Sequence, residues 1–86
     1  MYKLIVSNKA AKEIKEITKK SRDSQVAGLE EIQENPHIGK PLKRELTGRL
    51  TYRIGSYRII YKINKHDKVI NIITAGHRSY VYEKRL

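Results

Sequence analysis

Apolar and polar residues alternate with two different periods along this chain, and the first third indicates a strand followed by a helix. The apolar segment 2–6 predicts a short β-strand, and Ser7 after it is a favourable N-cap residue. Apolar positions then recur at helical spacing, which predicts a helix that buries Ala10, Ala11, Ile14 and Ile17. The solvent side of this helix is expected to hold Lys12, Glu13, Lys15 and Glu16.

A second helix is predicted directly after the first. Ser21 is its expected N-cap, and the buried stripe consists of Val26, Leu29 and Ile32. Gly28 weakens this helix slightly, and Asn35-Pro36 ends it because a residue before proline is disfavoured in the α region. Two amphipathic helices with a short connection form a helical hairpin, which we expect to cover one face of a sheet.

The remaining chain changes to a period of two, the period of β-strands. The predicted segments are a loop at 37–48, strands at 50–54, 57–63 and 69–75, turns at Gly55-Ser56 and 64–68, and a polar tail at 77–86. The third of these strands is the most apolar, so we expect it to be central. The sequence therefore predicts one α+β domain over residues 1–86, with order β-α-α-β-β-β, in which the helical hairpin packs on a mostly antiparallel four-stranded sheet.

The strand alternation also predicts a basic patch on the face away from the helices. The expected helix-facing residues are Leu50, Tyr52, Ile54, Tyr57, Ile59, Tyr61 and Ile63, so the opposite face receives Thr51, Arg53, Arg58 and Lys62. Arg53 and Arg58 meet across the tight turn, and Arg78 and Tyr82 follow the last strand. Planar guanidinium groups suit bidentate contacts with phosphate oxygens. The alternative is that each arginine is solvated or pairs with Glu45 or Glu83.

The charge distribution favours a polyanionic partner. The 86 residues carry a net charge of +10, of which residues 1–36 contribute +1 and residues 37–86 contribute +9. Such a field attracts nucleic acid, an anionic membrane or an acidic protein, although a merely soluble surface is the simpler reading. No apolar run is long enough to span a membrane, and no signal peptide is visible. Together with the absence of cysteine, this favours a cytoplasmic protein.

Other chemistry-bearing residues are few. Tyr82 lies beside arginines, where it can stack on a base or transfer a proton, and His77 can titrate near neutral pH. His37 and His66 are expected at the surface, and three dispersed histidines without cysteine predict no metal site. No nucleotide, serine-hydrolase or zinc-protease motif is present, so no cofactor is expected.

Two segments resemble the RelE/ParE toxin superfamily. The first runs from Gly39 through Gly48 into the block Tyr52–Tyr61, and the second comprises Gly76-His77-Arg78 with Val81-Tyr82, which is similar to the RelE branch. The resemblance implies a type II toxin that cleaves mRNA in the ribosomal A site, is bound by a bacterial 70S or archaeal ribosome, and is neutralised by a RelB-like or other type II antitoxin.

The resemblance also implies site residues. The catalytic set is Arg53, Arg58, Arg78, Tyr82 and His77, and the expected RNA-binding residues are Lys40, Lys43, Arg44, Arg49 and Lys62. Thr51 departs from the pattern, because the RelE type has a lysine there. Arginine remains protonated, so proton transfer falls to Tyr82 and His77. Three alternatives stay open: a ParE-like DNA gyrase inhibitor, a non-catalytic RNA-binding module, and a degenerate toxin that still binds its antitoxin.

Overall fold

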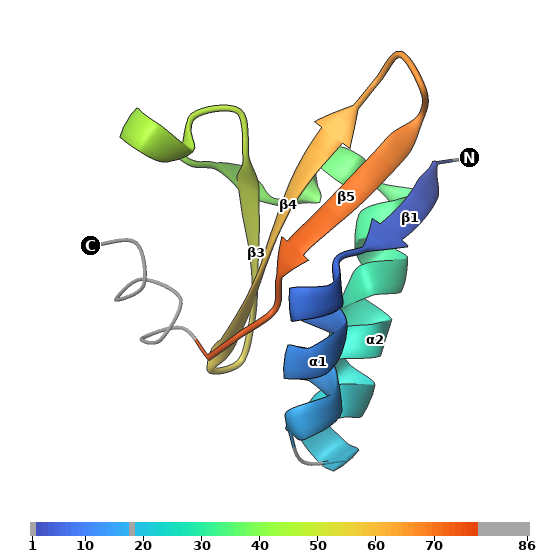
Figure 1. Cartoon of the computed structure of the whole chain (residues 1–86), viewed down its shortest axis with the longest axis vertical. Helices are drawn as coiled ribbons and strands as arrows, with labels where there is room; N and C mark the ends of the chain where they lie inside the picture. Colours follow the sequence, from blue (N-terminus) through green and yellow to red (C-terminus); the bar gives the residue numbers. More distant parts are fainter. Residues whose placement is uncertain (1, 18, 78–86) are drawn as a thin grey trace.

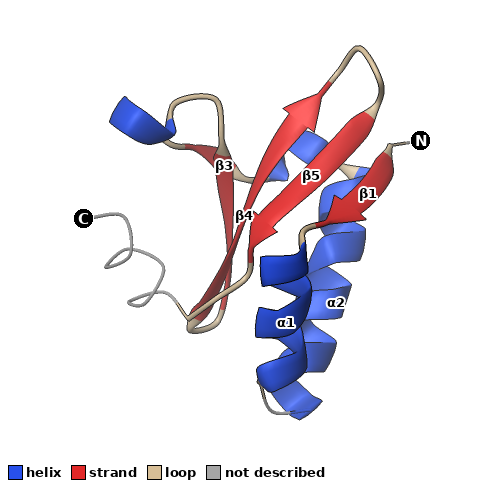
Figure 2. Cartoon of the chain, in the orientation of Figure 1, coloured by secondary structure: helices blue, strands red, loops and turns tan. Residues whose placement is uncertain are grey.

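The structure is a computed structural model that describes residues 2–17 and 19–77. Two helices pack on one face of a single twisted sheet, as Figures 1 and 2 show. The elements are β1 (Lys3–Val6), α1 (Asn8–Glu16), α2 (Lys19–Glu34), β2 (Lys40–Pro41), β3 (Leu50–Ile54), β4 (Tyr57–Asn64) and β5 (Val69–Thr74), with short 3₁₀ turns at Pro36–Ile38 and Arg44–Leu46. The predicted α+β class and element order are confirmed.

Within the described residues, the sheet has five strands, not the four predicted, in the order β1-β5-β4-β3-β2. The additional strand is β2, which pairs antiparallel with β3 inside the segment predicted as a loop. Pro41 can occupy β2 because an edge strand leaves one side of its ladder unpaired. β1 pairs parallel with β5, while the other pairs are antiparallel. β5 lies between β1 and β4, so it is an interior strand, but the central position that was predicted for it belongs to β4.

N-capping and helix propensity account for the residues at which the two helices begin. The Ser7 hydroxyl accepts a hydrogen bond from the Ala10 N–H at 3.0 Å, which confirms it as the N-cap of α1. The prediction of Ser21 as an N-cap is wrong, because α2 already begins at Lys19 and includes this serine. Lysine has high helix propensity, so the helix extends past the serine toward its N-terminus. The Arg22 guanidinium donates to the carbonyls of Lys15 and Ile17 and so satisfies acceptors at the end of α1.

The core lies between the helices and the sheet. Its fully buried strand residues include Ile59, Tyr61, Ile70 and Ile72, and the helices contribute Ala10, Leu29 and Ile32. Leu50, Tyr52, Ile54 and Ile63 pack against this cluster, which confirms the predicted helix-facing side of β3 and β4. Tyr57 is only partly buried and lies outside the cluster.

Two helix residues have roles that the sequence pattern did not predict. Glu13 was expected to face solvent, but its Oε1 accepts hydrogen bonds from the Thr74 hydroxyl at 2.6 Å and the Ala75 N–H at 3.1 Å. Gly28 is buried against β3, where an added Cβ would overlap the Ile54 side chain. This glycine therefore permits close approach of α2 to the sheet, which is a packing role rather than only a weakness of the helix. No helix among the described residues is both long enough and apolar enough to cross a membrane.

Candidate functional site

Arg53 and Arg58 are directly opposite each other in the β3–β4 hairpin. The intervening turn contains Gly55 at φ +58°, a left-handed conformation that glycine adopts without strain. The Arg53 side chain is exposed, whereas Arg58 is only 7% exposed. The prediction that the turn brings these two arginines together is confirmed. Like charges in directly opposed strand positions repel, and an anion that contacted both would relieve that repulsion.

The arginine pair lines a surface hollow of about 310 Å³ on the sheet face away from the helices. Its lining residues are Ile38, Lys40, Thr51, Tyr52, Arg53 and Arg58, and we call it the cationic hollow. Lys40 reaches it from β2, where it is the cross-strand partner of Thr51. None of these lining residues is acidic, so three positive charges converge without a carboxylate in the lining.

Thr51 supplies a polar atom to the cationic hollow. Its side chain is 8% exposed, and its Oγ1 is buried without a hydrogen-bond partner among the described residues. A buried hydroxyl without a partner costs about 1–3 kcal/mol in desolvation. A ligand oxygen that accepted a hydrogen bond from Thr51 would offset this cost. The strand alternation placed Thr51 on the open face, but the state of its hydroxyl depends on three-dimensional packing.

The Tyr61 hydroxyl holds the loop that leads into β2 through two hydrogen bonds. The Tyr61 hydroxyl accepts a hydrogen bond from the Gly39 N–H at 3.0 Å and donates one to the Pro36 carbonyl at 2.6 Å. Burial raises the pKa of this phenol above its ordinary value, and the hydrogen bond from the Gly39 N–H partly opposes the rise. Tyr61 was predicted only as a core residue, because sequence alternation reports the face of a ring and not the partner of its hydroxyl.

Tyr52 also lines the cationic hollow, but its hydroxyl contacts the helix layer. It donates a hydrogen bond to Glu31 Oε1 on α2 at 3.1 Å. Burial raises the Tyr52 pKa above its ordinary value, and the nearby Glu31 carboxylate raises it further because a phenolate would be repelled. Tyr52 is therefore a poor general base near neutral pH.

His77 lines a different cavity from the arginine pair. This second cavity, of about 500 Å³, lies between α1 and the strand ends, and its lining includes Lys12, Glu13, Tyr57 and His77. The rings of Tyr57 and His77 meet edge to face, with centroids 5.6 Å apart. Tyr57 is adjacent to Arg58 in β4 but faces the opposite side of the strand. His77 thus lies near the end of the arginine-bearing strand, but it does not line the cationic hollow.

The other predicted site residues are more dispersed. Lys43, Arg44 and Arg49 lie in the connection between β2 and β3, which projects away from the helices in Figure 1. Lys62 is exposed on β4, beyond Arg58 along the strand. Arg78 and Tyr82 lie outside the described residues, so their positions relative to the cationic hollow stay a prediction.

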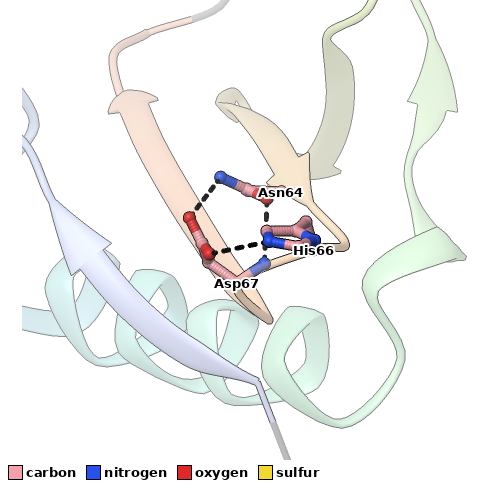
Figure 3. A network of polar contacts seen from close by, with 3 residues as sticks. All are labelled: Asn64, His66 and Asp67. Carbon is pink, nitrogen blue, oxygen red and sulfur yellow. Dashed lines mark hydrogen bonds and ion pairs between the residues drawn. The ribbon is translucent and has the colours of Figure 1, made fainter.

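The histidines predicted at the surface are exposed. His37 lies in the 3₁₀ turn after α2, and His66 lies in the β4–β5 turn. In that turn, Asn64 exchanges hydrogen bonds with Asp67, and His66 Nε2 lies 4.0 Å from Asp67 Oδ1 (Figure 3). Within residues 2–17 and 19–77, no group of three or more histidine, aspartate or glutamate side chains is placed to hold a metal ion.

The chain is similar to several known toxins. Toxin RelG of Mycobacterium tuberculosis is 38% identical over 47 residues, which cover 55% of this chain and 54% of RelG. The chain spans about half the length of the curated relatives it matches. Among solved structures, the RelBE2 toxin–antitoxin complex of M. tuberculosis matches with a TM-score of 0.82 and 26% identity, covering 90% of this chain and 98% of the matched chain. The isolated RelE toxin of Escherichia coli matches with a TM-score of 0.77 and 25% identity, covering 99% and 95%.

A family model confirms the relationship over nearly the whole sequence. The model for the ParE toxin of type II toxin–antitoxin systems, parDE, matches residues 4–82. Of the described elements, this range contains both helices, β2 to β5, all of β1 except Lys3, and every residue of the cationic hollow. The resemblance noted in the strand motifs therefore extends to the complete fold. The chain belongs to the RelE/ParE family of type II toxin–antitoxin toxins.

Proposed function

We propose that this protein is a type II toxin that cleaves mRNA bound in the ribosomal A site. The observation that carries the proposal is the opposition of Arg53 and Arg58 in a hollow that also receives Lys40. A surface that only attracted nucleic acid could use dispersed lysines. Two arginines held in one cross-strand pair are suited to a single phosphate group.

The proposed reaction requires no cofactor. The 2′-hydroxyl of one nucleotide loses its proton, and its oxygen forms a bond to the adjacent phosphorus. The bond from phosphorus to the 5′-oxygen of the next nucleotide breaks, and that oxygen takes up a proton. The products are a 2′,3′-cyclic phosphate and a 5′-hydroxyl. Arg58 and Arg53 would stabilise the additional negative charge that develops on the phosphate oxygens.

Proton transfer must come from other side chains, because arginine remains protonated. The resemblance assigns this work to Tyr82 and His77, with Arg78 as a further phosphate contact. His77 lines the neighbouring cavity and would need to turn toward the phosphate to take part. We therefore expect Tyr82→Phe to slow cleavage more than His77→Ala. The reverse order would assign the main proton transfer to the histidine.

The ribosome would supply the orientation that this sparse site lacks. Holding the 2′-hydroxyl in line with the phosphate converts an improbable encounter into a positioned reaction, a large contribution to rate. The expected regulatory partner is an acidic antitoxin that neutralises a toxin of net charge +10. RelE proteins of M. tuberculosis, E. coli and Pyrococcus horikoshii have been solved in complex with RelB, which supports such a partner.

The test is to incubate the purified protein with ribosomes programmed with a defined mRNA and to map the RNA ends by primer extension. We expect cleavage inside the A-site codon only when ribosomes are present, and strong slowing by Arg78→Ala and Tyr82→Ala. Naked mRNA is the control. Intact mRNA in the wild-type reaction would contradict the proposal that this protein is a nuclease.

A second candidate is a ParE-like inhibitor of DNA gyrase. The observation that favours it is the matching family model, which describes ParE toxins. It predicts inhibition of gyrase supercoiling by the wild-type protein and no dependence on Arg53 or Arg58. A protein that binds RNA without cleaving it, and leaves gyrase active, would instead be a non-catalytic RNA-binding module or a degenerate toxin.

A further inference from the structure

The Tyr61 hydroxyl lies where the chain passes from the helix layer to the face that carries the cationic hollow. Residues Pro36–Ile38 form a 3₁₀ turn after α2, and β2 begins two residues after this turn. Between them, Gly39 crosses the edge of β3. Tyr61 comes from β4 and is fully buried, and its one side-chain oxygen bonds to the Gly39 N–H at this crossing and to the Pro36 carbonyl before it.

This arrangement leaves little freedom at Gly39. A Cβ added to Gly39 would lie 2.7 Å from Tyr61 Oη and 2.9 Å from the Thr51 carbonyl oxygen. This close approach places the Gly39 N–H within reach of the phenol as the chain comes alongside β3. The next residue, Lys40, is then in register with Thr51. The position of Lys40 thus depends on a hydroxyl buried on the opposite side of the sheet.

The strand β2 has few other restraints. It consists of Lys40 and Pro41 only, and its second residue has no N–H to donate. Beyond it, the Leu42 N–H donates to the Arg49 carbonyl at 2.8 Å, which closes the following loop. On its N-terminal side, the paired hydrogen bonds of Tyr61 are the described contacts that tie the crossing to the sheet interior.

We propose that Tyr61 is a positioning residue that holds Lys40 against Thr51, so that Lys40 supplies the third phosphate-binding charge of the cationic hollow. This inference rests on the proposed RNA substrate, but it does not require cleavage. Tyr61 itself contacts no substrate, and it acts through Gly39 and the register of β2.

The hypothesis is tested by the salt dependence of RNA binding. Fluorescence anisotropy of the purified full chain with a labelled single-stranded RNA oligonucleotide gives the slope of log K against log[salt]. One lost phosphate contact reduces this slope by about 0.7. We expect Lys40→Ala and Tyr61→Phe each to reduce it by about that amount, and the double variant to reduce it no further. Non-additivity is the decisive readout, because a general loss of stability would not depend on Lys40.

Two further variants keep the test independent of folding. Tyr2→Phe is the matched control, because Tyr2 also packs against the core but lies at the N-terminal end of the fold, away from the hollow. It should leave the slope unchanged. Gly39→Ala disturbs the same contact from the loop side and should act like Tyr61→Phe. Thermal unfolding of each variant confirms that it is folded at the assay temperature.

The outcomes separate this inference from the proposed function. A wild-type slope retained in Tyr61→Phe, or a double variant that loses the sum of two contacts, would overturn the positioning role of Tyr61 even if mRNA is cleaved. An equal reduction of the slope in Tyr61→Phe and Lys40→Ala, with no further reduction in the double variant, would support the role even if no cleavage is found. No measurable RNA binding by wild type would overturn this inference, whereas the proposed cleavage is decided by the assay with programmed ribosomes.

Discussion

The two faces of the sheet differ in the kind of side chain that they bury. On the helix-covered face, the buried strand side chains are Ile59, Ile70, Ile72, Tyr61 and Thr74, and the two hydroxyls among them are both hydrogen-bonded. On the open face, β3 and β4 bury Thr51 and Arg58 beside Ile60, and the Thr51 hydroxyl has no partner among the described residues. The first face is optimised for packing, whereas the second retains polar groups that are costly to bury. This difference locates stability and candidate chemistry on opposite sides of the same strands.

The largest expected effect comes from the helix-covered face. Ile59→Ala removes buried methyl groups from a residue with no exposed surface and should lower the free energy of unfolding by about 2–5 kcal/mol. Urea denaturation followed by circular dichroism measures it. The folded fraction should bind RNA with an unchanged salt slope. A small stability loss accompanied by a changed slope would mean that the two faces are not separable.

Substitution of the arginine pair should instead change the salt dependence of RNA binding. Replacing both Arg53 and Arg58 with Gln removes two charges from the hollow, and we expect the salt slope for single-stranded RNA to fall by about 1.4, or two phosphate contacts. Lys65→Gln removes a charge from the exposed β4–β5 turn and is the control. Equal losses per charge at both places would show a diffuse basic field instead of a site.

Thr51→Val should have a smaller effect, which raises the free energy of unfolding but weakens RNA binding. Valine has a similar shape but no hydroxyl, so the free protein should become more stable by about 1–3 kcal/mol because an unsatisfied buried group is removed. RNA binding should weaken if the hydroxyl donates to a phosphate oxygen. Denaturation and anisotropy measure the two changes on one sample. A variant that is less stable and binds RNA normally would contradict the assigned role of Thr51.

The smallest effect is the pH dependence of stability in alkaline solution. Burial raises the pKa of Tyr61 above 10.0, and burial with Glu31 does the same for Tyr52. The folded state therefore holds these protons more tightly, so their contribution is complete below pH 10 and is lost as the pH rises through the folded-state pKa values. Thermal unfolding from pH 8 upward should show this decline, and Tyr61→Phe should reduce it. A decline of equal size in that variant would exclude Tyr61 as a source.

The fold was largely accessible from sequence because its main elements are long enough to display a period. β4 has eight residues and α2 has sixteen, so alternation and helical spacing are both evident. β2 has only two residues, and a pattern of period two cannot be recognised at that length. Its existence depends on pairing with Thr51 and Leu50, a contact between separate segments.

The site was accessible only in part. Cross-strand pairing of Arg53 with Arg58 follows from a two-residue turn, which fixes the register of a hairpin. The hydrogen bonds that support the site from the core could not be predicted from the sequence, because a tyrosine on a core face can direct its hydroxyl to many partners. The contacts of Tyr61 with Gly39 and of Glu13 with Thr74 join residues 22 and 61 positions apart. Local patterns contain no signal for such contacts.

The most direct test of the central claim is the rate of A-site mRNA cleavage on programmed ribosomes by Arg58→Gln and Lys65→Gln, each measured against wild type in single-turnover reactions. The two variants lose the same charge, one inside the cationic hollow and one in the β4–β5 turn. We predict a loss of about 10²–10³-fold for Arg58→Gln, the usual cost of removing one group that stabilises transition-state charge, and almost none for Lys65→Gln. Equal rates for the two variants would contradict the assignment of the open sheet face as the catalytic site.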